Sequence, residues 1–186
     1  MIGFCMTGSF CSFNKSIEIL EKLSKQYEIL PIMSENAYNF DTKFGKACDF
    51  RDKVEKICGK KIISSIPEAE PIGPSVVLDC LLVCPCTGNT LSKVAQGITD
   101  TCATMAIKAQ LRNDRSVLLA IATNDGLSGS FPNIARLAQR KNIFLVPFCQ
   151  DSPFKKRSSL VCDFDKVPQA LEYALRFEQL QPMLAT

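Results

Sequence analysis

The chain has 186 residues, of which 22 are basic and 19 acidic, and 46% are hydrophobic. These values are typical of a globular domain with a buried core, and we expect residues 1–186 to form a single domain. The net charge of +3 gives little electrostatic reason to expect nucleic-acid binding. No histidine is present, so this chain alone offers no Ser-His-Asp triad, no Cys-His pair and no His-ligated metal site.

Apolar runs of strand length alternate with stretches of helical periodicity along the whole chain. In chain order the predicted elements are a strand at 2–6, a helix at 13–25, a strand at 29–33, a helix at 46–58 ended by Gly59, a possible short strand at 61–66, a rigid Pro-rich connection at 67–74, a strand at 76–84, helices at 90–97 and 101–113, a strand at 117–122, a helix at 131–140, a closing strand at 143–147 and a last helix over 167–177. Asp100 and Asp165 are the candidate N-caps of the helices that follow them.

This alternation of strands and helices is typical of repeated βα units around a parallel sheet. The segment 76–84 is almost uninterrupted apolar sequence, which a strand buried on both faces requires, so it is the predicted centre of the sheet. The predicted fold class is a single doubly wound α/β domain, Rossmann-like or flavodoxin-like, with three layers and a parallel sheet.

The ten cysteines are expected to be reduced, because most of them lie in apolar stretches of a chain large enough to fold without disulfides. No apolar run approaches the ~20 residues that a membrane-spanning helix needs. The first residues also lack the basic segment of a signal peptide. We therefore predict a cytoplasmic protein without a membrane segment.

Ligands of open α/β sheets bind beyond the carboxyl ends of the strands, so the residues that follow each strand are the candidate site. The segment 7–12 contains one glycine and three hydroxyl side chains ahead of a predicted helix. Such a loop suits a terminal monophosphate, which backbone amides and hydroxyls hold without a lysine. The alternative, which we weigh equally for this segment alone, is a tight turn with Ser12 as N-cap.

Two further segments follow strands in the same way. After the predicted central strand, the segment 84–93 supplies donors at a second helix start through Thr87, Asn89, Thr90 and Ser92. The segment 123–130 follows the next strand, and it either reaches the same ligand or forms an ordinary turn.

Cys80, Cys84 and Cys86 offer a rival interpretation as metal ligands. Cys80 and Cys84 lie within an apolar strand that has no turn to gather them, and a fourth ligand would have to come from elsewhere, so we expect no metal site. Cys86 is instead the thiol expected beside the ligand, with its pKa lowered by the helix that follows.

The loop at 85–90 and the sequence Gly97-Ile98-Thr99-Asp100 resemble, in order, the second signature of an FMN-binding flavoprotein family. This family includes phosphopantothenoylcysteine decarboxylases, lantibiotic cysteine decarboxylases and flavin prenyltransferases. Thr7-Gly8-Ser9 stands where the first phosphate loop of the family stands, and Ser34 matches a family Ser or Thr that contacts the phosphate. From the three segments and the resemblance, the candidate FMN-binding residues are Thr7, Gly8, Ser9, Ser34, Thr87, Gly88, Asn89, Thr90, Thr123 and Asn124.

Within the family, the chain is most similar to a sporulation branch of endospore-forming bacteria. The similarity is effectively full length and includes the segments 42–45, 69–74, 85–89, 123–125 and 147–148. It departs from that branch at Cys5, Cys86, Cys149 and 128–132. The resemblance implies oxidation of dihydrodipicolinate, a cyclic dicarboxylate, to dipicolinate in the mother cell, together with a separate NAD(P)-binding A subunit. It also implies a homo-oligomer, a trimer or a multiple of trimers.

Other functions within the family fit the residues less well. The decarboxylase branch relies on a catalytic histidine, which is absent, and the prenyltransferase branch has an arginine where Thr123 stands. Two alternatives stay open, another FMN-dependent enzyme of the family and a cofactor-free scaffold that stabilises the A subunit. No catalytic residue is assigned. Glu35 is expected to face solvent, and Lys93, Lys108 and Arg112 are candidate partners of the substrate carboxylates, with solvated surface as their alternative role.

Overall fold

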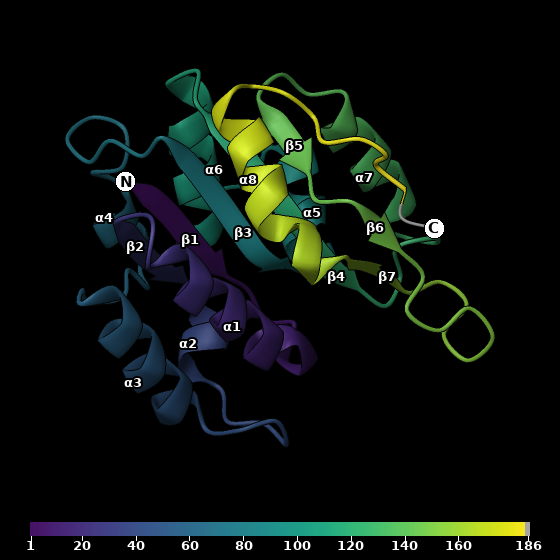
Figure 1. Cartoon of the computed structure of the whole chain (residues 1–186), viewed down its shortest axis with the longest axis horizontal. Coiled ribbons are helices and arrows are strands. Elements are labelled where there is room, and N and C mark those ends of the chain that lie inside the picture. Colours follow the sequence, from purple (N-terminus) through teal and green to yellow (C-terminus); the bar gives the residue numbers. More distant parts are fainter. Residues whose placement is uncertain (185–186) are drawn as a thin grey trace.

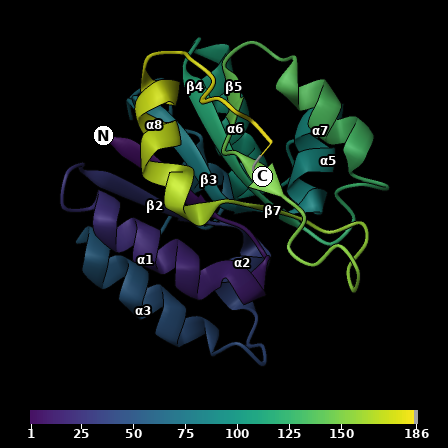
Figure 2. The same cartoon turned by 45° about the vertical axis from the view of Figure 1, so that its right-hand side comes forward.

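The computed structural model describes residues 1–184, in which a seven-stranded sheet lies between two layers of helices (Figures 1 and 2). Residues 185 and 186 of the expected domain lie outside the described part. The strands are β1 (Ile2–Met6), β2 (Ile29–Met33), β3 (Cys80–Cys86), β4 (Ser116–Thr123), β5 (Ile143–Leu145), β6 (Phe148–Cys149) and β7 (Leu160–Cys162). The helices are α1 (Phe13–Leu23), α2 (Glu35–Asn39), α3 (Ala47–Cys58), α4 (Ile66–Ala69), α5 (Gly88–Gln96), α6 (Cys102–Arg112), α7 (Phe131–Ala138) and α8 (Val167–Leu175), and two 3-10 turns are η1 (Phe10–Ser12) and η2 (Phe164–Lys166).

Five strands form a parallel sheet in the order β2-β1-β3-β4-β5. Ile2 at the start of β1 is in register with Ile29 of β2 on one side and with Cys80 of β3 on the other. This is the flavodoxin-like strand order, and the predicted α/β fold class is confirmed. In this order the direction of winding reverses between β1 and β3, and the strand ends at that point form the crevice where such sheets bind ligands.

Helices cover both faces of the sheet, as the two views agree (Figures 1 and 2). Residues of α1, α3 and α8 pack on one face and residues of α4, α5, α6 and α7 on the other. β3 supplies both cores because its side chains alternate: Leu82 faces the first and Leu81 the second. None of the helices in the described part is long and apolar enough to cross a membrane.

The sheet continues beyond its parallel part with β7 and β6, which the sequence did not predict. β7 pairs antiparallel with the end of β4, where Thr123 is opposite Leu160, and β6 pairs antiparallel with β7. The predicted closing strand at 143–147 is therefore wrong in extent, since β5 ends at Leu145 and another strand begins at Phe148. Strands of two or three residues carry too little alternation to be predicted.

The predicted central strand does lie at the centre of the sheet, but its first and last residues differ from the predicted ones. It begins at Cys80 rather than at 76, because Val77 is 49% exposed and only Leu78 of the preceding residues is fully buried. It extends to Cys86, with a register shift between Val83 and Cys86 against β4. The possible strand at 61–66 is reduced to a single bridge between Ile63 and Ile32.

The rigid connection expected at 67–74 contains part of a short helix. α4 begins at Ile66, and its Glu68 accepts hydrogen bonds from the amides of Ser64 at 2.9 Å and Ser65 at 3.0 Å. A proline lies in its first turn, where the missing N–H costs nothing. The composition of this segment thus indicated a turn where its charged and proline residues in fact start a helix.

Both predicted N-caps are wrong by one residue. Thr101 caps α6 by accepting from the amide of Thr104 at 3.1 Å. The N-cap position of α8 is Lys166, whose side chain makes no capping bond, while Asp163 caps the preceding turn η2 by accepting from the amide of Asp165 at 3.1 Å. Phe177 lies beyond the end of α8 and is 52% exposed. The helix ends at Gly59 and Gly97 are confirmed, because both glycines have left-handed backbone angles, with φ of 62° and 76°.

Candidate functional site

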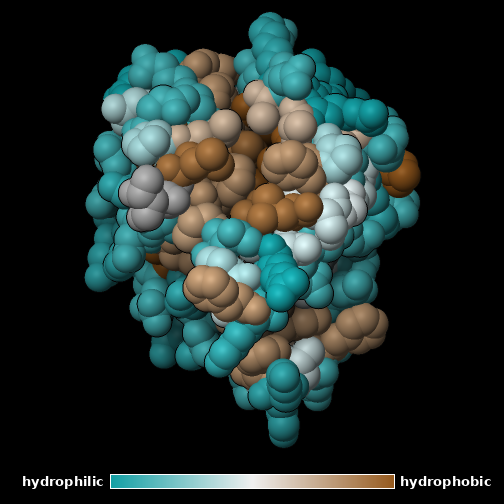
Figure 3. Space-filling view, turned by 90° about the vertical axis from the view of Figure 1, so that its right-hand side faces the viewer, coloured by the Kyte–Doolittle hydropathy of each residue, from teal (hydrophilic) through white to brown (hydrophobic). Residues whose placement is uncertain are grey.

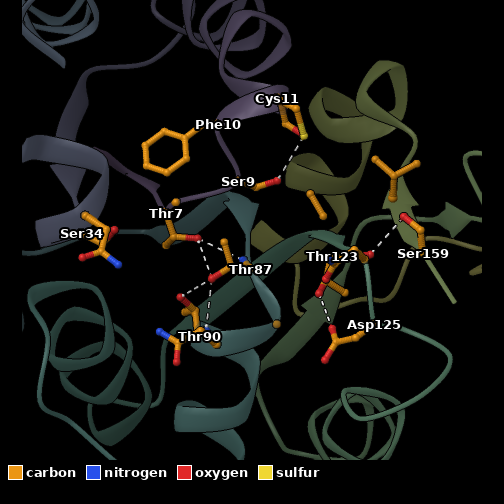
Figure 4. Close-up of a pocket in the computed structure, with 18 of the residues that line it drawn as sticks. Thr7, Ser9, Phe10, Cys11, Ser34, Thr87, Thr90, Thr123, Asp125 and Ser159 are labelled. Carbon is orange, nitrogen blue, oxygen red and sulfur yellow. Dashed lines mark hydrogen bonds between the residues drawn. The ribbon is translucent and has the colours of Figure 1, made fainter. Parts of the chain in front are cut away.

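The ten candidate cofactor-binding residues all line one cavity of about 1030 Å³ at the carboxyl ends of β1 to β4 (Figure 4). Ligand sites typically have volumes of ~300–1,000 Å³, so the cavity is large enough for a cofactor. Its walls come from the loops after β1, β2, β3 and β4, from the start of α6, and from the segment 151–164. The parallel sheet thus brings together residues that are up to 117 positions apart, from Thr7 to Asn124.

A chain of threonine hydroxyls ties β1 to β3 at the base of this cavity (Figure 4). Thr7 Oγ1 donates to the carbonyl of Pro85 at 2.9 Å and accepts from the amide of Thr87 at 3.0 Å. Thr87 Oγ1 lies 3.0 Å from Thr90 Oγ1 and also accepts from the amide of Thr90 as the N-cap of α5. These three hydroxyls are therefore engaged with one another, and their main role is to fix the loops.

Several backbone amides at the cavity have no hydrogen-bond partner among the described residues. They belong to two helix starts, η1 with α1 after β1, and α5 after β3. The unpartnered amides are those of Gly8, Phe10, Cys11, Gly88 and Asn89. Because amides at a helix start carry partial positive charge, they attract an anion to this end of the sheet.

Two serine hydroxyls also stay free to donate beside these amides. Ser9 Oγ has only a weak contact, 3.9 Å from Cys11 Sγ. Ser34 Oγ accepts from the amide of Ala37 at 3.4 Å as the N-cap of α2, and this leaves its hydrogen available. Ser12 does occupy the N-cap position of α1, as the tight-turn alternative expected, but its side chain makes no capping bond.

The loop after β4 is held by a carboxylate. Asp125 Oδ1 accepts from Thr123 Oγ1 and, at 2.8 Å, from Ser130 Oγ. A Cβ on Gly88 would lie 2.6 Å from Thr123 Oγ1 and 2.8 Å from Asp125 Oδ1, so the start of α5 fits against this loop only without a side chain. Thr123 therefore positions the loop, whereas the exposed side chain of Asn124 is free.

Four lysines and four acids line the cavity, so its formal charge is close to neutral. Two ion pairs account for half of them: Lys93 with Asp100 at 2.8 Å and Lys156 with Asp151 at 2.7 Å. The hydrogen bond from Lys93 lowers the pKa of Asp100, and the hydrogen bond to Asp151 raises the pKa of Lys156. The other four are Lys15, Lys43, Glu35 and Asp125.

Only one of the three cations predicted to meet a substrate lies here. Lys93 lines the cavity, whereas Lys108 and Arg112 line a second cavity of about 280 Å³ formed by other residues. Lys15, Lys43 and Lys156 were missed. No pattern in the sequence separates them from surface lysines, because their positions depend on how distant segments fold over the strand ends.

Glu35 does not simply face solvent, as the sequence had suggested. Its Oε1 accepts from the amide of Cys102 at 3.0 Å. Glu35 thus provides a hydrogen-bond acceptor for the first amide of α6, although the two residues are 67 positions apart. A carboxylate at a helix start is favoured by the helix dipole. The residue therefore fixes one wall of the cavity.

The cysteines of β3 are buried and do not all face the same side of the sheet. Cys80 and Cys84 face the core under α1 and α8, and Cys86 faces the opposite core. Burial raises the pKa of Cys80 and Cys84 to about 12, and it raises the pKa of Cys86 as well, so the lowered pKa expected for Cys86 is wrong. The exposed thiol that lines the cavity is Cys11.

Comparisons with known proteins identify the family and the fold. The family described as Flavoprotein matches residues 1–168. The B subunit of dipicolinate synthase from Bacillus subtilis is 44% identical over 184 residues, which cover 98% of this chain and 92% of that protein. The crystal structure of the B subunit of dipicolinate synthase from Bacillus halodurans covers 100% of this chain and 95% of its own, with a TM-score of 0.91 and 39% identity. The FMN-dependent cysteine decarboxylase SpaF shares the fold, with a TM-score of 0.71, 19% identity and 94% of each chain covered.

Proposed function

The chain belongs to the flavoprotein family, and on that premise we propose that it binds FMN and acts as the B subunit of a dipicolinate synthase. Near-full-length similarity to proteins of that name supports the second part. In this role it works with an NAD(P)-binding A subunit to oxidise dihydrodipicolinate to dipicolinate in the cytoplasm of the mother cell.

The observation that carries the FMN assignment is the set of unpartnered donors after β1. The amides of Gly8, Phe10 and Cys11 and the hydroxyls of Ser9 and Ser34 offer a phosphate dianion several charge-assisted bonds. Each such bond contributes ~1.5–3 kcal/mol. The donor set fits one terminal phosphate, as in FMN, and it needs no cation.

The remaining residues of the cavity would hold the rest of the cofactor. Asn89 and Asn124 present free side-chain amides, while Thr7, Thr87, Thr90 and Thr123 keep the loops in place. The flavin ring supplies a hydride acceptor, which removal of two hydrogens from the substrate requires.

We also propose a homo-oligomer, a trimer or a multiple of trimers, as the assembly that meets the A subunit. Large apolar side chains are exposed at Leu127, Phe131, Phe154 and Leu184, with Phe154 at 94%. Figure 3 shows apolar residues gathered around a hollow on the side of the molecule where α7, β6 and the C-terminus lie. An exposed apolar area of this kind is typical of a contact surface.

Replacing Ser9 by alanine should weaken FMN binding about tenfold or more, because the loss of one charge-assisted phosphate bond of ~1.5–3 kcal/mol corresponds to at least that factor. Calorimetry with FMN, FAD and NAD provides the measurement, and FMN should bind most tightly. Ser24→Ala is a matched control, since Ser24 Oγ donates to the carbonyl of Glu21 at the far end of α1. Tighter binding of FAD or NAD than of FMN would contradict the assignment.

Alkylation of the free thiols should distinguish Cys11 from the other exposed cysteine. Without ligand, Cys11 and Cys48 should react first, because the β3 thiols are buried. Saturating FMN should protect Cys11, which lines the cavity, and leave Cys48 reactive. Peptide mass spectrometry gives the modified fraction at each position, and equal labelling of Cys11 with and without FMN would place the cofactor elsewhere.

A further inference from the structure

Lys15 and Lys43 differ from the other lysines of the cavity. Lys93 and Lys156 are each neutralised by an aspartate, but Lys15 and Lys43 have no acidic group within ion-pair distance among residues 1–184. The ammonium group of neither lysine makes a hydrogen bond to the described residues. The cavity therefore carries two cations whose charge is not balanced by a direct partner.

Each of these two lysines lies over the ring of a phenylalanine. Lys15 Nζ is 5.7 Å from the ring centroid of Phe164, and Lys43 Nζ is 5.2 Å from that of Phe44. Within ~6 Å, the ring attracts an ammonium group without removing its charge. The rings thus restrict where the two ammonium groups lie and leave them free to meet an anion.

The two lysines come from different walls of the cavity. Lys15 is in the first turn of α1, next to η2, which contains Phe164. Lys43 is at the tip of a turn that is closed by two backbone bonds between Thr42 and Gly45, of 3.0 and 3.1 Å. A ligand that touches both ammonium groups therefore contacts both walls of the cavity.

We propose that Lys15 and Lys43 form a recognition site for a dicarboxylate, one lysine for each carboxylate of the substrate. The inference rests on the proposed function, which makes the ligand a cyclic dicarboxylate. The phosphate of FMN does not need these cations, because the amides and hydroxyls after β1 and β2 already provide its donors. Two unneutralised cations match the two negative charges that the substrate brings beside the flavin.

A second group of cations offers an alternative location for the same anion. Lys108, Arg112 and Arg140 line the cavity of about 280 Å³, together with the ion pair of Lys141 and Asp114. Arg112 is in the last turn of α6, where a cation is favoured by the helix dipole, and Arg140, just beyond α7, donates to the carbonyl of Val94, so neither needs a ligand to account for it. The small volume and this position make the second cavity the weaker candidate, and substitution of Arg112 separates the two sites.

The test is a titration of the FMN-loaded protein with dipicolinate, followed by calorimetry and by the visible spectrum of the flavin. The buffer contains no divalent cation, because a pyridine-2,6-dicarboxylate chelates such ions. We expect Lys15→Gln and Lys43→Gln each to weaken dipicolinate binding about tenfold, with FMN affinity unchanged within about twofold. Picolinate has one carboxylate, so one of the two substitutions should weaken picolinate binding and the other should leave it unchanged.

Lys22→Gln and Lys46→Gln are the matched controls. Lys22 is in the last turn of α1 and Lys46 follows the 42–45 turn, and neither lines the cavity. Both controls should bind dipicolinate like the unmodified protein. Arg112→Gln should also have no effect, whereas a loss of binding in this variant would move the site to the second cavity and overturn the inference.

Three other results would also overturn the inference. The FMN-loaded protein could fail to bind dipicolinate, or the variant with both Lys15→Gln and Lys43→Gln could bind dipicolinate as tightly as the unmodified protein. The substitutions could also weaken FMN binding rather than dipicolinate binding, which would assign the two lysines to the phosphate. A protein that binds no FMN would defeat the proposed function instead. In that case calorimetry of dipicolinate with the flavin-free protein and its two lysine variants decides the inference independently.

Discussion

Replacing Asn89 by alanine is expected to lower the rate of dipicolinate formation by the reconstituted two-subunit complex about 100-fold. The Asn89 side chain is exposed, lines the cavity and has no partner among the described residues, so its removal leaves the fold intact. A cofactor that is displaced at the strand ends no longer holds reacting atoms at ~3–3.5 Å, and a misplacement of about 1 Å costs on that order in rate. The loss of activity should parallel the loss of FMN across a series of variants.

Two controls make this result interpretable. Asn14→Ala removes the same side chain from an exposed position of α1 outside the cavity and should retain full activity. Thr90→Ala should reduce both activity and stability, since Thr90 Oγ1 lies 3.0 Å from Thr87 Oγ1 in the chain of hydroxyls. Full activity in a complex that contains a variant of this chain unable to bind FMN would refute a catalytic role and leave the scaffold role.

Gly88→Ala should destabilise the protein by about 1–3 kcal/mol, the usual cost of adding a methyl group to a filled space. The new Cβ would lie 2.6 to 2.8 Å from Thr123 Oγ1, Ser130 Oγ and Asp125 Oδ1, and these short side chains have little room to move. Alanine favours a helix over glycine by up to ~1 kcal/mol, so the clash must exceed this gain. Urea unfolding measures the free energy difference.

Gly8→Ala is the matched comparison for this substitution. Its Cβ would have no neighbour closer than 3.7 Å, and Gly8 is not among the glycines with a left-handed φ. We expect its stability to stay within about 0.5 kcal/mol of the unmodified protein. If both variants are as stable as the unmodified protein, the loop after β4 can move to make room for a side chain at position 88, and the prediction is wrong.

The sequence was sufficient for the framework of the fold. β1 and β2 begin and end at the predicted residues, because each is a short apolar run between polar segments. The ten candidate residues share one cavity because parallel strands end at the same edge of a sheet, so residues that follow such strands are neighbours wherever they lie in the chain.

What the sequence could not predict is which of these residues are free to bind. Thr7 and Thr87 are as polar in the sequence as Ser9 and Ser34, but they engage each other across 80 positions and so become structural. Glu35 was expected to face solvent and Lys15 carried no signal, because their contacts with Cys102 and Phe164 join distant segments. Side-chain pairing over such distances leaves no periodic signal in a single chain.

The outer edge of β4 is divided between two partners, and this makes one wall of the pocket mechanically separate from the rest. Residues 117–119 pair with β5, while only Ala122 and Thr123 pair with β7. The hairpin of β6 and β7 therefore depends on the parallel sheet through two residue pairs, yet it places Lys156, Ser159 and Val161 at the cavity. Insertions or exchanges between 150 and 159 should therefore reshape this wall of the cavity while the loops after β1 and β3 keep their positions, so this segment is the natural place to engineer a different ligand preference.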